Sequence, residues 1–129
     1  MRYCVLMRSI NRERGVCTPM KDIAVEYLGG SGFLVTIGET GFLFDASEHG
    51  AEKRELPKKE ALAAYRKLYV FVSHRHDDHF SESIYDLCGE DAVYIVGFDV
   101  PQPYRGVRMN PGEKQGFGNV TVKAFGSTD

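Results

Sequence analysis

The chain has 129 residues and a formal net charge of −2, from 16 basic and 18 acidic residues. Its length fits one ordinary domain, and its composition (43% hydrophobic, 26% charged) is that of a globular protein with a core. The near-balanced charge gives no electrostatic basis for binding nucleic acid or an anionic membrane. No apolar run approaches the roughly 18 residues of a membrane span, so we expect a cytoplasmic protein that does not enter the membrane.

The cysteines predict no covalent or metal framework. Cys4, Cys17 and Cys88 are scattered, odd in number, and form no Cys-x-x-Cys pair. We therefore expect free thiols in a reducing compartment. Cys88 follows an apolar helical stretch and is expected to be a core residue.

The first nineteen residues differ from the rest of the chain. They show no sustained period of 2 or 3.6, and a regular pattern begins only at Met20. We therefore expect residues 1–19 to be an N-terminal extension, and one hypothesis is that Met20 is the natural start. The domain itself is expected over residues 20–129.

Two hairpins in series open this domain. The connections "GGSG" and "GETG" are rich in residues that tolerate turn conformations. They separate three short apolar segments, which predict an antiparallel meander of strands at 23–27, 33–37 and 42–44.

The middle of the chain alternates between helical and strand patterns. Residues 58–68 have one apolar helical face after Pro57, and the run "LYVFV" at 68–72 predicts a strand buried on both faces. Ser81 is a candidate N-cap for a short helix that ends at Gly89. Further strands are expected at 92–97, 107–109 and 119–125. This order indicates a layered α/β arrangement.

Three of the four histidines lie in "VFVSHRHDDHF", residues 70–80, just after the buried strand. Imidazole and carboxylate are ligand types that zinc, iron and manganese accept. Alternate residues of an extended segment point the same way, so His74 and His76 can reach one metal. A chain turn near Asp77 would bring Asp78 and His79 to a second point nearby. Two metals so placed can activate a shared water for hydrolysis.

The neighbouring polar residues have plainer interpretations. Arg75, Asp77 and His49 are expected to be solvated surface residues. Asp45 ends the third predicted strand, and two roles are open for it. It is either a turn or helix cap, or a partner that holds a ligand histidine in one tautomer.

At these residues the chain resembles the metallo-β-lactamase fold hydrolases. The motif H-x-H-x-D-H after an apolar strand is matched at all four fixed positions, and "VEYLGGSGFLVTIGETGFLFD" resembles the opening meander of that superfamily. "VSHRHDDHF" and the terminal "GSTD" resemble an uncharacterised bacterial subgroup. The resemblance runs from about Met20 to Asp129.

This resemblance implies a fold and a site. The fold would be the N-terminal half of an αββα sandwich, with a mixed, mostly antiparallel sheet and flanking helices. His74 and His76 would bind the first metal, and Asp78, also the catalytic carboxylate, would bind the second with His79. Zinc is the default, with iron or manganese as alternatives. Asp45 would be the structural aspartate beneath the site.

The chain departs from the family in three respects. Gly30 stands where many relatives carry a histidine, and the third histidine of the first metal has no counterpart, although Asp129 lies near its place. The family fold also continues for about as much chain again, with a second sheet, a metal-bridging aspartate and a final histidine.

Three functions follow as alternatives. The first is a truncated metal-dependent hydrolase of an ester, amide, lactone or phosphodiester, weakly active or inactive alone. The second is a metal-binding or interaction half-domain that needs a partner chain, or self-associates through an uncovered sheet face. The third is a nuclease of the same superfamily, against which the charge balance counts.

Overall fold

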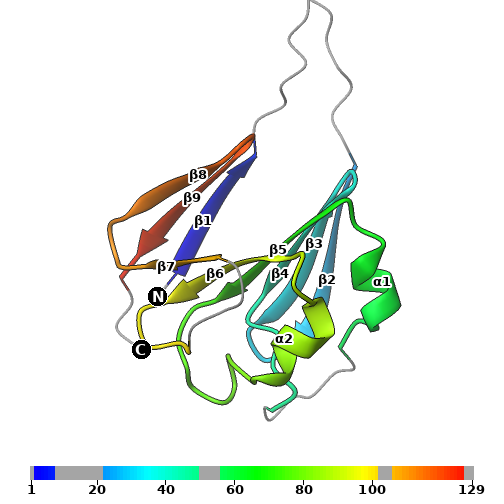
Figure 1. The fold of residues 1–129 in the computed structure, drawn as a ribbon, viewed down its shortest axis with the longest axis horizontal. Helices are drawn as coiled ribbons and strands as arrows, with labels where there is room; N and C mark the ends of the chain where they lie inside the picture. The colour runs from blue at the N-terminus through cyan, green and yellow to red at the C-terminus, as the bar shows by residue number, and fades with distance from the viewer. Residues whose placement is uncertain (1, 8–21, 50–55, 102–105, 127–129) are drawn as a thin grey trace, which may run out of the picture.

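The computed structural model describes residues 2–7, 22–49, 56–101 and 106–126, the first of these segments through its backbone. Nine strands and two short helices lie in these ranges (Figure 1). The strands are β1 (Arg2–Met7), β2 (Ile23–Gly29), β3 (Gly32–Ile37), β4 (Thr40–Phe44), β5 (Lys67–Val72), β6 (Val93–Gly97), β7 (Gly106–Met109), β8 (Lys114–Phe117) and β9 (Val120–Phe125), and the helices are α1 (Lys59–Ala63) and α2 (Ser83–Cys88). None of these helices is long and apolar enough to cross a membrane.

A mixed six-stranded sheet forms the centre of the fold, in the order β2-β3-β4-β5-β6-β7. The predicted meander is confirmed, because β2, β3 and β4 pair antiparallel. From β4 to β7 the pairing is parallel. Parallel strands need crossover connections, and α1 and α2 lie in two of them. The chain is therefore an α/β protein.

A second, antiparallel sheet has the order β1-β9-β8. Its first strand comes from the segment that we expected to be an extension, and it pairs with β9 from Arg2↔Phe125 to Met7↔Val120. The proposed start at Met20 lies outside the described residues. Strand β8 was not predicted, since its sequence KQGF lacks the β-branched residues typical of strands.

Two cores lie on the two faces of the large sheet. Alternate side chains of each strand face opposite sides. One set packs with Leu62 of α1 and Ile84 of α2. The other set is rich in aromatic residues and packs against the small sheet. The second set contains Phe42, Tyr69, Phe71, Ile95 and Met109 from the large sheet and Val120, Val122 and Ala124 from β9.

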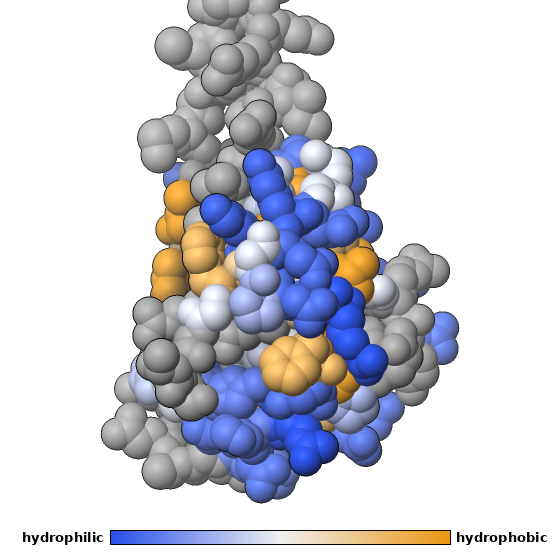
Figure 2. Space-filling view, turned by 90° about the vertical axis from the view of Figure 1, so that its left-hand side faces the viewer, coloured by the Kyte–Doolittle hydropathy of each residue, from blue (hydrophilic) through white to orange (hydrophobic). Residues whose placement is uncertain are grey.

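The expectation of an uncovered sheet face is therefore wrong over the centre of the large sheet. Phe71 and Ile95 are only 1% and 0% exposed there. The same face remains open over the edge strand β2, where Ile23 and Val25 are 58% and 63% exposed. Figure 2 shows that the side of the molecule on which β8 and β9 lie is largely hydrophilic, with apolar side chains in separate groups.

Both helices differ in detail from the prediction. Helix α1 ends at Ala63 and not near residue 68, because the chain must turn and extend into β5 from Lys67. Helix α2 ends at Gly89, as predicted, with a positive φ of 79°. Its N-cap is Glu82, so the predicted cap at Ser81 is wrong. The Ser81 hydroxyl instead donates to Glu48 Oε1 at 3.1 Å.

Candidate metal centre

The candidate site begins where β4 and β5 end side by side. These strands are parallel, so their carboxyl ends meet at one edge of the sheet, where α/β proteins commonly bind ligands. Asp45 continues the ladder past β4, and its N–H donates to the Phe71 carbonyl at 2.9 Å. Ser73 and His74 follow β5 directly. The parallel pairing thus brings Asp45 next to the start of the histidine segment.

Asp45 anchors the first residue of this segment and one of its histidines. Its Oδ1 accepts the Ser73 N–H at 2.7 Å. Its Oδ2 accepts the Ser73 hydroxyl at 2.6 Å and lies 2.8 Å from His79 Nδ1. The side chains of Asp45 and His79 are only 13% and 14% exposed. Asp45 also has a φ of +41°, a conformation that few non-glycine residues adopt and that aspartate tolerates.

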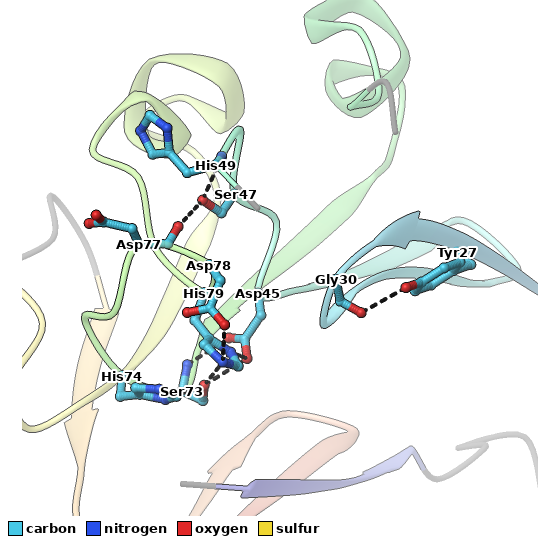
Figure 3. A network of polar contacts seen from close by, with 10 residues as sticks. All are labelled: Tyr27, Gly30, Asp45, Ser47, His49, Ser73, His74, Asp77, Asp78 and His79. Carbon is cyan, nitrogen blue, oxygen red and sulfur yellow. Dashed lines mark hydrogen bonds and ion pairs between the residues drawn. The ribbon is translucent and has the colours of Figure 1, made fainter. Parts of the chain in front are cut away.

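A turn returns the chain to Asp45 after His76. The His76 carbonyl accepts the N–H of His79 at 2.8 Å and of Phe80 at 2.9 Å. This turn brings three imidazoles together. The His74 ring centroid lies 4.1 Å from that of His79 and 4.6 Å from that of His76. His74, Asp78 and His79 gather beside Asp45 and Ser73 in Figure 3.

The hydrogen bonds of Asp45 and Ser73 determine the tautomers of His79 and His74. A carboxylate only accepts, so His79 must donate its Nδ1–H to Asp45. Ser73 has one hydroxyl proton, and it goes to Asp45 at 2.6 Å. The 3.0 Å contact between Ser73 Oγ and His74 Nδ1 must then be a donation from His74. When neutral, both rings therefore carry their lone pair on Nε2, the arrangement found where a carboxylate orients a metal-bound histidine.

Burial favours the neutral form of His74. Partial burial lowers the pKa of the His74 imidazole, and the nearby His79 and His76 lower it further, against the attraction of the Asp45 carboxylate. A neutral imidazole is the form that binds a metal.

The donor chemistry of the cluster fits zinc. His79 Nε2 lies 3.4 Å from Asp78 Oδ2. That is longer than an ordinary N–H···O hydrogen bond, and imidazole nitrogen and carboxylate oxygen are both donor types that zinc accepts. Within the described ranges, no group of three or more His, Cys, Asp or Glu side chains is arranged to hold a metal ion. Two of the four expected ligands, His76 and Asp78, are exposed.

The remaining predicted residues lie around the cluster or beyond the described residues. The Asp77 carboxylate points away from the histidines in Figure 3, and its carbonyl accepts a hydrogen bond from the Ser47 hydroxyl. The His49 side chain is 58% exposed and 4.0 Å from Glu48, and Arg75 is exposed as well. Asp129 lies outside the described residues.

Gly30 borders the site. A Cβ added there would lie 3.9 Å from the Asp78 carbonyl, so position 30 faces the turn that carries the candidate ligands. Its φ of +55° disfavours most other residues.

Sequence reasoning missed Ser73. It is 6% exposed and contacts Asp45, His74 and His79. Its position as the one polar residue between a buried strand and the first histidine was the available signal. Ser73, His79 and Asp45 do not form a hydrolytic triad, because the hydroxyl and the carboxylate both face Nδ1 of the imidazole.

No protein-family model matches this chain, and no curated protein matches it either. The resemblance to the metallo-β-lactamase fold hydrolases therefore rests on the sequence pattern alone.

Proposed function

We propose that the chain carries a divalent metal centre of a hydrolase, of the kind found in metallo-β-lactamase folds. The observation that carries this proposal is the Asp45 anchor. It accepts the Nδ1 proton of His79 directly and sets the His74 tautomer through Ser73, so two imidazoles present Nε2 at one strand edge. The layering of two helices, a large sheet and a small sheet supports half of an αββα sandwich.

The side chains divide between two neighbouring half-sites. His74 and His76 would hold one ion, and Asp78 and His79 a second. Bound there, such ions would supply Lewis-acid chemistry that activates water for hydrolysis of an ester, amide, lactone or phosphodiester. Asp45 and Ser73 orient the imidazoles. Asp78 is 63% exposed, so its carboxylate is accessible to accept the proton of the attacking water.

Weak turnover is expected of these residues by themselves. A catalytic zinc site generally has three protein ligands and one open position. His74 and His76 supply only two ligands for the first metal, and Asp129 is the proposed third. Affinity and rate should both depend on that additional ligand.

The test compares metal-free and zinc-loaded protein on p-nitrophenyl acetate, bis(p-nitrophenyl) phosphate and an acyl homoserine lactone. We expect slow hydrolysis of at least one substrate that is lost with chelator and restored by zinc. Asp78→Asn should abolish it, whereas the adjacent Asp77→Asn should leave it unchanged, because that carboxylate points away from the cluster. Activity that survives chelation, or that falls equally in both variants, would contradict the proposal.

A second candidate function is a metal-binding module that self-associates. The exposed side chains of Ile23, Val25 and Phe33 on β2 and β3 favour it, because they extend the apolar layer between the sheets into solvent. Sedimentation velocity would detect such a complex. If the wild type sediments as a monomer at all concentrations, with the same sedimentation coefficient as Val25→Thr, this function is ruled out.

A further inference from the structure

The outer edge of β2 has the properties of a strand-pairing surface. Among the described strands, only β3 pairs with β2, so the other edge of this seven-residue strand has no ladder partner. Edge strands are usually protected by prolines, lysines or bulges. β2 contains no proline or lysine, its one charged residue is Glu26, and its irregularity lies at the end, between Tyr27 and Gly29. The edge is therefore open to pairing with another strand.

The backbone groups that point outward from this edge follow from the pairing with β3. The Gly38 N–H donates to the Asp22 carbonyl at 3.4 Å, and these two residues lie opposite each other when the register Ile23↔Ile37 is extended by one position. In an antiparallel pair, hydrogen-bonded and non-hydrogen-bonded residue pairs alternate along the strands. Counting from Asp22, residues 23, 25 and 27 therefore direct their N–H and C=O groups away from β3.

Two of these residues also carry the exposed apolar side chains of β2. Ile23 and Val25 are 58% and 63% exposed. They lie opposite Ile37 and Val35, which pack against the core between the two sheets. Residues directly opposite in a sheet share a face, so Ile23 and Val25 face the same side as that core. Outward backbone groups and exposed apolar side chains thus coincide at alternate positions of one strand.

A second copy of β2 matches this edge. With two copies antiparallel about a two-fold axis at Val25, each Val25 lies opposite its counterpart, and each Ile23 lies opposite Tyr27 of the other copy. This register pairs the outward N–H and C=O groups of all three residues, and it joins the apolar side chains of both copies on one face. The same patch serves on both copies, so the contact closes at a dimer and does not propagate into a fibre.

Charge distinguishes this register from its neighbours. With the axis at Val25, Glu26 lies opposite Ala24 of the other copy. An axis at Glu26 would place this carboxylate opposite its own counterpart, and an axis at Ala24 would place it opposite Asp22. Like charges directly opposite each other are destabilising, and both shifted registers also pair fewer of the outward groups.

We infer that β2 is a dimerisation strand. Two copies of this chain associate edge to edge through antiparallel β2 pairing centred on Val25, which joins their two six-stranded sheets into one. This inference specifies the contact of the self-associating candidate function, and it rests on that function for the association alone. It requires no metal, because no residue of the histidine cluster lies on β2.

Sedimentation velocity of the full chain in the presence of a chelator tests the surface. The wild type should dimerise with increasing concentration. Val25→Lys should raise the dimer dissociation constant at least about 10-fold, because it places two ammonium groups opposite each other at the axis. Phe98→Lys is the matched control, since it changes a 64% exposed apolar residue after β6, and it should dimerise as the wild type does. A wild type that stays monomeric, or a Val25→Lys protein that dimerises normally, would overturn the inference.

Disulfide formation tests the register, in a background with the native cysteines replaced by serine. In a hydrogen-bonded pair, two residues at position 25 have Cα atoms about 5.5 Å apart, within the range that a disulfide spans. Val25→Cys should therefore form a disulfide-linked dimer in a glutathione redox buffer. Ala24→Cys should not, because position 24 lies opposite position 26 of the other copy. Equal cross-linking of both variants, or of neither, would overturn the inference.

A zinc titration of the wild type and of Val25→Lys separates this inference from the proposed metal centre. Both proteins should bind zinc equally, because β2 carries none of the expected ligands. If neither protein binds zinc while the wild type dimerises in chelator, the metal centre fails and the dimer stands. If both bind zinc and the wild type stays monomeric, the dimer fails and the metal centre stands.

Discussion

Replacing Asp45 by asparagine should weaken both the fold and the metal site, for one reason. The amide keeps an oxygen for the Ser73 N–H but places an NH₂ group where Oδ2 accepts from the Ser73 hydroxyl and from His79 Nδ1. Two hydrogen bonds to a charged acceptor, each contributing about 1.5–3 kcal/mol, become neutral bonds of about 0.5–1.5 kcal/mol. The metal-free protein should therefore lose about 2 kcal/mol of its free energy of unfolding.

The effect on metal binding should be specific. Opposite the NH₂ group of asparagine, His79 Nδ1 must accept a hydrogen bond, so the ring proton moves to Nε2. The Nε2 lone pair, which faces Asp78, is then no longer available to a metal. Loss of such an orienting carboxylate typically lowers metal affinity 10- to 100-fold. Urea unfolding in chelator and zinc titration against a competing chelator measure the two effects. Asp91→Asn is the matched control, since Asp91 is an exposed aspartate in the turn before β6. An Asp45→Asn protein with wild-type zinc affinity would refute the reasoning.

Three further outcomes follow from the same structure. Ser73→Ala should lower the free energy of unfolding in urea by about 1–2 kcal/mol. It should lower zinc affinity less than Asp45→Asn does, because Asp45 still accepts the proton of His79. A larger loss of zinc affinity in Ser73→Ala than in Asp45→Asn would contradict this. A Cβ on Gly97 would lie 2.2 Å from the Ser73 carbonyl oxygen. Gly97→Ala should therefore destabilise by at least about 3 kcal/mol, whereas Gly116→Ala, with open space around it, should change stability by less than about 0.5 kcal/mol. Burial raises the pKa of the Cys88 thiol to about 12. In a variant with the other two cysteines replaced by serine, the folded protein should therefore react very slowly with a thiol reagent at pH 8. The same variant should react fully in urea. Rapid reaction of the folded protein would place Cys88 outside the core.

The parts of the fold that were predictable have strong local patterns. The run at 68–72 became β5, whose last five residues are buried, because a strand between two others must be apolar on both faces. The two short loops predicted the meander because their glycine-rich sequences favour tight turns between neighbouring strands. Strands β1 and β8 carry no such pattern. β1 is formed by pairing with β9, which lies more than 100 residues along the chain, and no local signal reports that contact.

The candidate site also contains features that a local sequence pattern predicts and features that depend on contacts between distant segments. Ligand spacing predicted that the histidines and Asp78 gather after β5, since alternation and a turn are local properties. The role of Asp45 stayed open because it depends on β4 lying parallel to β5. The contribution of Ser73 was missed because its hydroxyl links Asp45 to His74, and the sequence does not show that Asp45 lies beside it.

The most direct measurement of the central claim is a long-range ¹H–¹⁵N NMR spectrum of the histidine side chains, recorded before and during addition of zinc. His79 should be the Nδ1–H tautomer in the metal-free protein, because Asp45 accepts that proton. Zinc should then shift the Nε2 signals of His74 and His79 while both Nδ1 atoms stay protonated. An Nε2–H tautomer of His79, or signals that do not respond to stoichiometric zinc, would contradict the account.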